Sequence, residues 1–287
     1  MAQRALVLSG GGVAGIAWEL GMLLGIRDGS DGEVDPAGQA ELVVGTSAGA
    51  AVAAQLHGAP LEELYARQLS DQHGELAVDY DRDALMAVVA QAFADRTRDL
   101  KDSLRELGDY ALAADTVSEP KRRAVLEARL PSHEWPERRV LVTAVSVDGD
   151  FVVFDRNSGV DLVDAVAASC AVPGIWPPVT IDGRRYVDGG MRSTTNADLA
   201  HGADRVLALV TNPDALEKGQ LGGVHRELAD LAPAPTLVVA ADPSSRRAFG
   251  PNALDPSVRR ASAEAGRARG RAVAAEVAAF WSAGATS

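Results

Sequence analysis

The chain is poor in cysteine, in aromatic residues and in long apolar runs. Its 287 residues include a single cysteine, Cys170, which excludes an intrachain disulfide framework and a multi-cysteine zinc site and fits a reducing compartment. Aromatic residues make up only 5% of the chain, so alanine, valine and leucine must do most of the packing. No uninterrupted apolar stretch reaches the ~18 residues of a membrane-spanning helix, and no signal peptide is visible. We therefore expect a cytoplasmic protein.

Basic residues are also scarce. Lysine and arginine number 28 against 40 aspartates and glutamates, which gives a formal net charge of −12. A nucleic-acid-binding protein needs a basic face for its phosphate contacts, so this charge argues against that class. It also weakens electrostatic attraction to an anionic membrane surface. With 47% hydrophobic residues and no recognisable linker or internal repeat, the sequence predicts a single domain over residues 1–287.

The first part of the chain alternates strand-like and helix-like segments. Residues 5–8 and 42–44 are predicted as strands, and residues 12–26 and 48–56 as helices. This alternation is typical of an α/β fold with a mainly parallel sheet and helices on both faces.

Residues 60–131 interrupt the alternation. They contain no good strand, whereas helical spacing occurs at 60–69, 81–95, 100–115 and 118–130. A helical insertion at this place predicts either a cap over a site or ordinary covering helices of a large sheet. The sheet resumes afterwards with two predicted hairpins, 139–155 and 179–187, late strands at 205–210 and 236–240, and a long terminal helix at 256–281.

A serine between two glycines follows the second predicted strand. Gly45-Thr46-Ser47-Ala48-Gly49 matches G-x-S-x-G, the pattern of a nucleophile on a tight strand-to-helix turn. The glycines allow neighbouring backbone to approach, and the following helix directs its positive dipole end near the serine. Ser47 is therefore a candidate nucleophile. The alternative is a plain glycine-rich turn in which the serine only caps the helix.

A glycine cluster follows the first predicted strand. Gly10, Gly12 and Gly15 satisfy G-x-G-x-x-G, which could indicate dinucleotide binding by an oxidoreductase. That fingerprint also predicts an acidic residue at the end of the second strand, where this chain has Gly45-Thr46-Ser47 instead, so the nucleotide interpretation is disfavoured. The same loop suits an oxyanion hole, because bare glycines let successive backbone N–H groups converge beside a helix N-terminus.

The base that would take the serine proton is sought among histidines and carboxylates. The five histidines are more typical of surface or capping residues, and His225 is placed best for a late triad position; the full set is His57, His73, His133, His201 and His225. Asp188 is the better candidate. It directly follows a short strand and precedes Gly189 and Gly190, which leave room around its carboxylate. The alternative is an ordinary turn aspartate, as expected for Asp182-Gly183.

These motifs, in this order, resemble the patatin-like phospholipase family. They are Gly10-Gly11-Gly12-x-x-Gly15, the Gly45–Gly49 turn and Asp188-Gly189-Gly190, with a fourth block, ASCAVPGIWPPV at residues 168–179, similar to the family's A-S-x-A-x-P-x-x-F-P-P stretch. The resemblance covers residues 4 to 198.

The resemblance implies a three-layer α/β/α sandwich and hydrolysis of lipid acyl esters through an acyl-enzyme. Ser47 and Asp188 would form a dyad without histidine, and the backbone of Gly10, Gly11 and Gly12 would form the oxyanion hole. No metal and no cofactor are implied, and the partner is a lipid or acyl-ester substrate reached by transient contact with a membrane or micelle. Structural roles are expected for Pro173, Pro177 and Asn196.

One departure from the family pattern concerns the glycine loop. The family usually has Arg or Lys at the position of Ala14. Without that cation the loop keeps its backbone donors, but a catalytically impaired lipid-binding or regulatory homologue becomes an alternative to an active enzyme.

Overall fold

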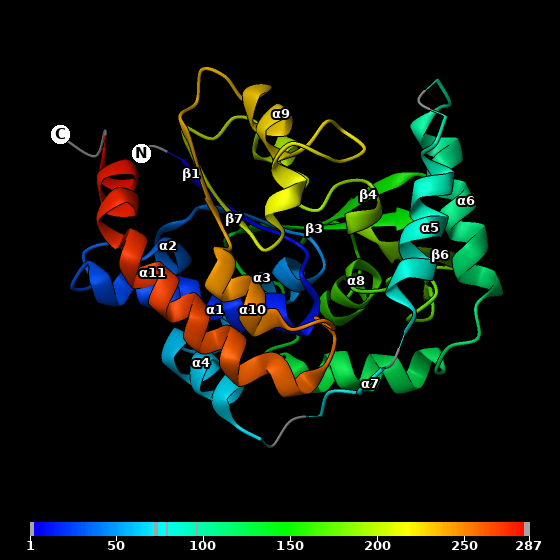
Figure 1. The fold of residues 1–287 in the computed structure, drawn as a ribbon, viewed down its shortest axis with the longest axis horizontal. Coiled ribbons are helices and arrows are strands. Elements are labelled where there is room, and N and C mark those ends of the chain that lie inside the picture. The colour runs from blue at the N-terminus through cyan, green and yellow to red at the C-terminus, as the bar shows by residue number, and fades with distance from the viewer. Residues whose placement is uncertain (1–2, 72–73, 79, 96, 284–287) are drawn as a thin grey trace.

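The computed structural model describes residues 3–71, 74–78, 80–95 and 97–283. Within them a central sheet of eight strands has the order β5-β6-β3-β2-β1-β7-β8, and β4 pairs with β3 (Figure 1). The strands are β1 (Arg4–Leu8), β2 (Leu42–Gly45), β3 (Arg139–Ser146), β4 (Phe151–Phe154), β5 (Val179–Ile181), β6 (Arg184–Asp188), β7 (Arg205–Val210) and β8 (Thr236–Ala240).

Eleven α-helices lie within the described residues. They are α1 (Gly12–Gly29), α2 (Pro36–Gln39), α3 (Ala48–Gly58), α4 (Leu61–Leu69), α5 (Arg82–Ala92), α6 (Leu100–Ala113), α7 (Glu119–Arg129), α8 (Leu162–Ser169), α9 (Val224–Ala229), α10 (Pro243–Phe249) and α11 (Arg259–Ser282). The short helices α2, α9 and α10 were not predicted, because segments of four to seven residues are too short to show a helical period.

The sheet is mostly parallel, as predicted. Strands β3, β2, β1, β7 and β8 run parallel to one another, whereas β4 and β6 pair with β3 in antiparallel fashion and β5 pairs with β6 in the same way. Leu8 at the end of β1 is in register with Gly45 at the end of β2. The loops after these two parallel strands therefore open at the same edge of the sheet, where α/β proteins bind their ligands.

Helices cover both faces of the sheet, unevenly. Alternate residues of β1 point to opposite sides: Leu6 and Leu8 join a large apolar cluster with α1, α3, α8 and α11, whereas Ala5 and Val7 join a smaller cluster that includes α9. Figure 1 shows this division, with α1, α4, α10 and α11 gathered on one side of the sheet and α9 on the other. The predicted α/β fold with helical layers around a central sheet is confirmed.

Helices α1 and α11 pack backbone to backbone. A Cβ atom built on Gly21 would lie 2.2 Å from the carbonyl oxygen of Ala263, and one on Gly25 would lie 2.2 Å from that of Arg267. Side chains at these positions would force the helices apart, so glycine permits the close approach. In a chain with few aromatic residues, such small-residue contacts replace bulky side chains in filling the core.

The predicted helical insertion is present as α4 to α7, and its described residues form no strand. Helix α4 packs against α1 and α11, α7 packs against α8, and α6 packs against β3 and β6, so the insertion is spread over the molecule and α6 covers the β3–β6 part of the sheet (Figure 1). Among the described residues, none of the helices combines the length and the apolar composition needed to cross a bilayer.

Candidate active site

Ser47 occupies a strained bend between β2 and α3. Its backbone angles are φ 53° and ψ −111°, in the positive-φ region that residues other than glycine rarely adopt. Two contacts hold the bend: the Ser47 N–H donates to Ser169 Oγ over 2.9 Å, and Cys170 Sγ donates to the Ser47 carbonyl over 3.3 Å. The side chain thus stands at the N-terminus of α3, which matches the turn expected of a nucleophilic serine.

The glycines on either side of Ser47 are required by packing. A Cβ atom on Gly49 would lie 2.1 Å from the carbonyl oxygen of Leu8, and one on Gly45 would lie 2.6 Å from Ala50 Cα. Real Cβ atoms do not approach backbone so closely, so a larger residue at position 49 would move the turn away from β1, and one at position 45 would push against the start of α3.

The N-terminal glycine loop lies against the serine. A Cβ atom on Gly10 would be 3.4 Å from Ser47 Cβ, and Gly12 has a φ of +63° at the start of α1. The Gly10 N–H donates to the Thr194 carbonyl over 2.8 Å. For the Gly11 and Gly12 amides no acceptor is found within the described part of the chain, as is usual for the first N–H groups of a helix. Of the three predicted oxyanion donors, Gly11 and Gly12 are therefore the two whose N–H groups have no acceptor among the described residues.

Asp188 ends β6 with its side chain inside the protein. It is only 2% exposed, and Gly190 N–H donates to Asp188 Oδ1 over 2.7 Å. Burial raises the pKa of Asp188 to about 7, against the opposing effects of a side-chain hydrogen bond from Ser47 and of the Gly190 backbone. The structure thus brings together the two side chains that the sequence singled out, and a carboxyl group with a pKa of about 7 is able to accept a proton near neutral pH.

The turn after Asp188 leaves no room for larger residues. A Cβ atom on Gly189 would lie 2.3 Å from Thr143 Oγ1, and one on Gly190 would lie 2.9 Å from Asp188 Oδ1. By contrast, Asp182 sits in the exposed hairpin turn between β5 and β6 with a φ of 50°, as expected of an ordinary turn residue.

One short segment, residues 169–171, accepts a backbone hydrogen bond from each of the two candidate catalytic residues. The sequence did not predict these contacts. Ser169 accepts the Ser47 N–H, and two residues later the Ala171 carbonyl accepts the Asp188 N–H over 2.9 Å. This segment belongs to the ASCAVPGIWPPV block, for which we expected only a wall formed by Pro173 and Pro177. Both prolines are buried, and their neighbours Val172 and Trp176 line the cavity beside Ser47.

Asn196 contacts both motif loops, the one that carries Ser47 and the one that follows Asp188. It is fully buried in the left-handed conformation, with a φ of 47°. Its side-chain N–H groups lie within hydrogen-bonding distance of Thr46 Oγ1 (3.0 Å), the Ser193 carbonyl (2.8 Å) and the Gly189 carbonyl (3.3 Å). This is the structural role expected of Asn196: it links the residue before Ser47 to the residue after Asp188.

The described histidines lie outside the cavity beside Ser47. His225 stands on α9 with half of its side chain exposed, 3.6 Å from Glu217. His57 lies in the last turn of α3, the His133 ring contacts the Glu127 carbonyl, and His201 follows a short 3₁₀ helix. In the described part of the chain, no histidine lines the cavity beside Ser47. His73 lies outside the described residues.

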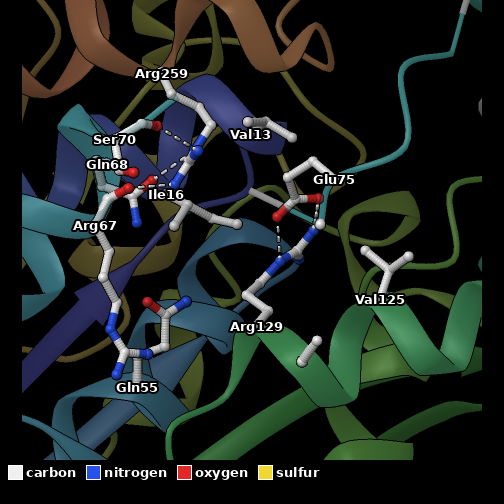
Figure 2. Close-up of a pocket in the computed structure, with 12 residues that line it drawn as sticks. Val13, Ile16, Gln55, Arg67, Gln68, Ser70, Glu75, Val125, Arg129 and Arg259 are labelled. Atoms are coloured by element: carbon white, nitrogen blue, oxygen red, sulfur yellow. Dashed lines mark hydrogen bonds and ion pairs between the residues drawn. The ribbon is translucent and has the colours of Figure 1, made fainter. Parts of the chain in front are cut away.

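One cavity reaches Ser47, and a second cavity lies beside the first. The first is narrow and is lined by Ser47 and Ala48 together with Arg122, Cys170 and Trp176. The second has a volume of about 290 Å³ and is bordered by α4, α7 and the start of α11. Figure 2 shows its polar wall, formed by Glu75, Arg129, Arg259, Gln68 and Arg67. The cavities share the lining residues Val13, Ile16 and Arg129, so they lie next to each other.

Ala14, where the family usually has a cation, is fully buried. Its N–H donates to the Ala253 carbonyl over 2.9 Å, which attaches the start of α1 to the chain ahead of α11. The glycine loop is therefore held by backbone hydrogen bonds and by the Thr211 hydroxyl, which donates to the Gly10 carbonyl, rather than by a charged side chain.

Comparison with known proteins agrees with this geometry at the level of the family. No curated protein matches the chain. Among solved structures, it is similar to VipD from Legionella pneumophila (13% identity, TM-score 0.42, 96% of this chain and 67% of VipD covered). It is also similar to the type III effector protein ExoU (16% identity, TM-score 0.40, 96% of this chain and 53% of ExoU covered).

The comparison with family models is more informative. The match to the patatin-like phospholipase model runs over residues 6–201, which include the glycine loop, the Ser47 turn and Asp188. Because this match spans well over half of the 287 residues, the chain belongs to the patatin-like phospholipase family.

Proposed function

We propose that this protein is a serine hydrolase that cleaves acyl esters of lipids, with Ser47 as the nucleophile and Asp188 as the general base. Membership of the patatin-like phospholipase family supports lipid acyl hydrolysis at the family level. The observation that carries the proposal for this chain is the position of Ser47 on its strained bend, where its side chain is close enough to the buried Asp188 carboxylate to lower the pKa of that group.

The proposed reaction passes through an acyl-enzyme. Ser47 Oγ attacks the ester carbonyl carbon while Asp188 accepts the hydroxyl proton. Asp188 then returns this proton to the leaving alcohol as the carbon–oxygen ester bond breaks, which leaves the acyl group on Ser47. In the second half, Asp188 takes a proton from water, the resulting hydroxide attacks the acyl carbonyl, and the fatty acid leaves as Ser47 recovers its proton.

Burial of Asp188 favours its role as a base. An exposed aspartate, with a pKa near 3.9, is a weak proton acceptor at neutral pH. The pKa of about 7 for Asp188 matches the acceptor to the working pH and brings its basicity close to that of a histidine. A buried carboxylate can therefore do the work for which other serine hydrolases use an imidazole.

The oxyanion of the tetrahedral intermediate would be bound by the glycine loop. The unengaged Gly11 and Gly12 amides lie at the N-terminus of α1, where the helix dipole adds a positive potential. Gly10, whose amide is engaged by Thr194, would contribute by letting the loop approach Ser47.

A fluorophosphonate probe tests this function directly, because it phosphonylates only an activated serine. We expect the wild-type protein to be labelled and to hydrolyse short-chain esters, and Ser47→Ala to lose both properties. Asp188→Asn should lose at least ~10³-fold in turnover, since the proton acceptor is gone. His225→Ala should retain wild-type activity, because its side chain is exposed on α9.

Two outcomes would contradict the proposal. Full hydrolysis by Asp188→Asn, or loss of activity in His225→Ala, would replace the dyad by a histidine-dependent triad. Absence of labelling and of hydrolysis in the folded wild-type protein would favour a family member that binds lipids without cleaving them.

A further inference from the structure

The guanidinium group of Arg122 is buried beside Ser47 and forms no ion pair with any residue that the structure describes. Arg122 lies on α7, is 7% exposed and lines the same narrow cavity as Ser47. Its guanidinium stacks 3.6 Å from the centre of the Trp176 ring. Among the residues that the structure describes, it makes neither a hydrogen bond nor an ion pair, so its N–H donors are available to a ligand in the cavity.

The other arginines of the two cavities are already engaged. Arg129 donates two hydrogen bonds to Glu75, over 2.8 and 2.6 Å (Figure 2). Arg259 donates to Gln68 and to the backbone carbonyls of Arg67 and Ser70 at the end of α4. Arg67 pairs with Glu63 over 2.6 Å. Glu75 is the acidic residue of the cavity lining, and both of its oxygens are taken by Arg129.

A buried cation without a partner is unfavourable, so its presence needs an explanation. Burial and the positive charge of Arg129 together lower the pKa of Arg122 to about 10, against smaller opposing effects of Cys170 and Glu75, so the group stays protonated at neutral pH. Stacking on Trp176 offsets part of the cost of desolvation. The remaining cost would be removed by an anion that enters the cavity and accepts hydrogen bonds from the guanidinium.

The position of Arg122 is notable because the chain is otherwise acidic. With a net charge of −12, the protein repels anions at long range, and the glycine loop itself offers no charged side chain at Ala14. A local cation is therefore required if the site is to hold an anionic group next to the scissile bond.

We propose that Arg122 is a specificity-determining residue that binds an anionic oxygen group of the substrate, phosphate or carboxylate, close to the ester that Ser47 attacks. This inference rests on the proposed hydrolase function. The planar guanidinium presents a fork of donors that matches either group in bidentate geometry. The enzyme would then prefer esters with such a group to neutral esters of the same acyl length.

Two pairs of soluble substrates test this preference and locate the anion. The first pair is 1-hexanoylglycerol and 1-hexanoylglycerol 3-phosphate, in which the anion is on the leaving alcohol. The second pair is 4-nitrophenyl pentanoate and mono-4-nitrophenyl glutarate, in which the anion is on the acyl chain. We expect wild-type kcat/KM to favour the anionic member of one pair.

Substitution of Arg122 should remove the preference. In Arg122→Gln, kcat/KM for the favoured anionic ester should fall about 10- to 100-fold, mainly through KM, because one charge-assisted contact is lost. The neutral partner should change less than about threefold, and Arg122→Lys should recover part of the effect. Lys121→Gln is the matched control, since it removes an exposed positive charge from the same helix and should leave both rates unchanged.

The result that overturns this inference is distinct from failure of the proposed function. Equal wild-type rates within both pairs, or an equal loss in Arg122→Gln and Lys121→Gln, would show that Arg122 does not select an anion. Fluorophosphonate labelling of Arg122→Gln establishes that the variant is folded with an intact nucleophile. If no ester is hydrolysed and no labelling occurs in the wild type, the proposed function itself fails.

Discussion

The side-chain amide of Asn196 donates a hydrogen bond to the Thr46 hydroxyl over 3.0 Å, although the two residues are 150 positions apart. The same amide lies 3.3 Å from the carbonyl oxygen of Gly189. Thr46 precedes the candidate nucleophile and Gly189 follows the candidate base, so one buried side chain sets the spacing of the two loops.

Asn196→Ala should therefore impair catalysis and stability together. It removes the hydrogen bonds from the side-chain amide to the Thr46 hydroxyl and to the Ser193 and Gly189 carbonyls, and alanine is less favourable than asparagine in the left-handed conformation. We expect a loss of about 2–4 kcal/mol in the free energy of unfolding, measured by urea denaturation, and a fall in kcat at nearly constant KM. The exposed Asn157→Ala is the control, and equal effects in both variants would contradict the linking role.

The pH dependence of hydrolysis should report the ionisation of Asp188. Only the carboxylate form accepts the Ser47 proton, and the pKa of this group is about 7. The value of kcat/KM should thus rise with pH, be about tenfold lower at pH 6 than on the plateau, and level off above pH 8. The profile should be the same in His225→Ala. A flat profile between pH 5 and pH 9 would be inconsistent with Asp188 as the base.

Glu19 should make the protein less stable as pH rises. This residue of α1 is fully buried, and neither carboxylate oxygen has a hydrogen-bond partner among the described residues. Burial raises the pKa of Glu19 well above its ordinary value, and the Ser9 backbone opposes the shift only in part. A carboxyl group with a raised pKa in the folded state contributes stability at low pH, and this contribution is lost as pH rises above 4.5 through the raised pKa.

Glu19→Gln tests this effect. The variant should match the wild type at pH 4.5 and be more stable by about 1–3 kcal/mol at pH 8, as followed by thermal unfolding. Glu33→Gln, at an exposed position, should show no such difference. If the Glu19→Gln gain were the same at both pH values, ionisation of Glu19 would not be its cause.

Close packing of α1 and α11 predicts the effect of a single methyl group. In Gly25→Ala, the new Cβ atom would lie 2.2 Å from the Arg267 carbonyl oxygen. The loss from forcing the helices apart, about 1–3 kcal/mol, should exceed the gain of about 1 kcal/mol in helix propensity. Gly74→Ala, with no atom within 4 Å of the new Cβ, should change the free energy of unfolding by less than about 0.5 kcal/mol. A stabilised Gly25→Ala variant would mean that the helices separate freely.

Most of the fold could be predicted from the sequence, because its signals are local. The strands at β7 and β8 have the predicted bounds, and both predicted hairpins form around Asp148-Gly149 and Asp182-Gly183. Apolar runs, Asp-Gly turns and glycine clusters act on neighbours in the chain. The short helices α2, α9 and α10 escaped prediction because tertiary contacts, rather than a periodic pattern, select their conformation.

The candidate site shows the same division between features that local sequence predicts and features that depend on tertiary contacts. Ser47, Asp188 and the glycine loop were recognisable in the sequence because each lies in a compact motif whose glycines are required by local backbone geometry. Which loop amides remain unengaged depended on Thr194, and the support of both loops depended on Ser169, Ala171 and Asn196. Positive charge at the site depended on Arg122, which lies in a polar predicted helix and carries no sequence motif that would mark it as a site residue.

The sequence by itself thus determined the elements and the reactive groups, since these follow from short-range chemistry. Only the tertiary structure decided their burial, partners and pKa values, because desolvation depends on segments that meet in space from distant parts of the chain.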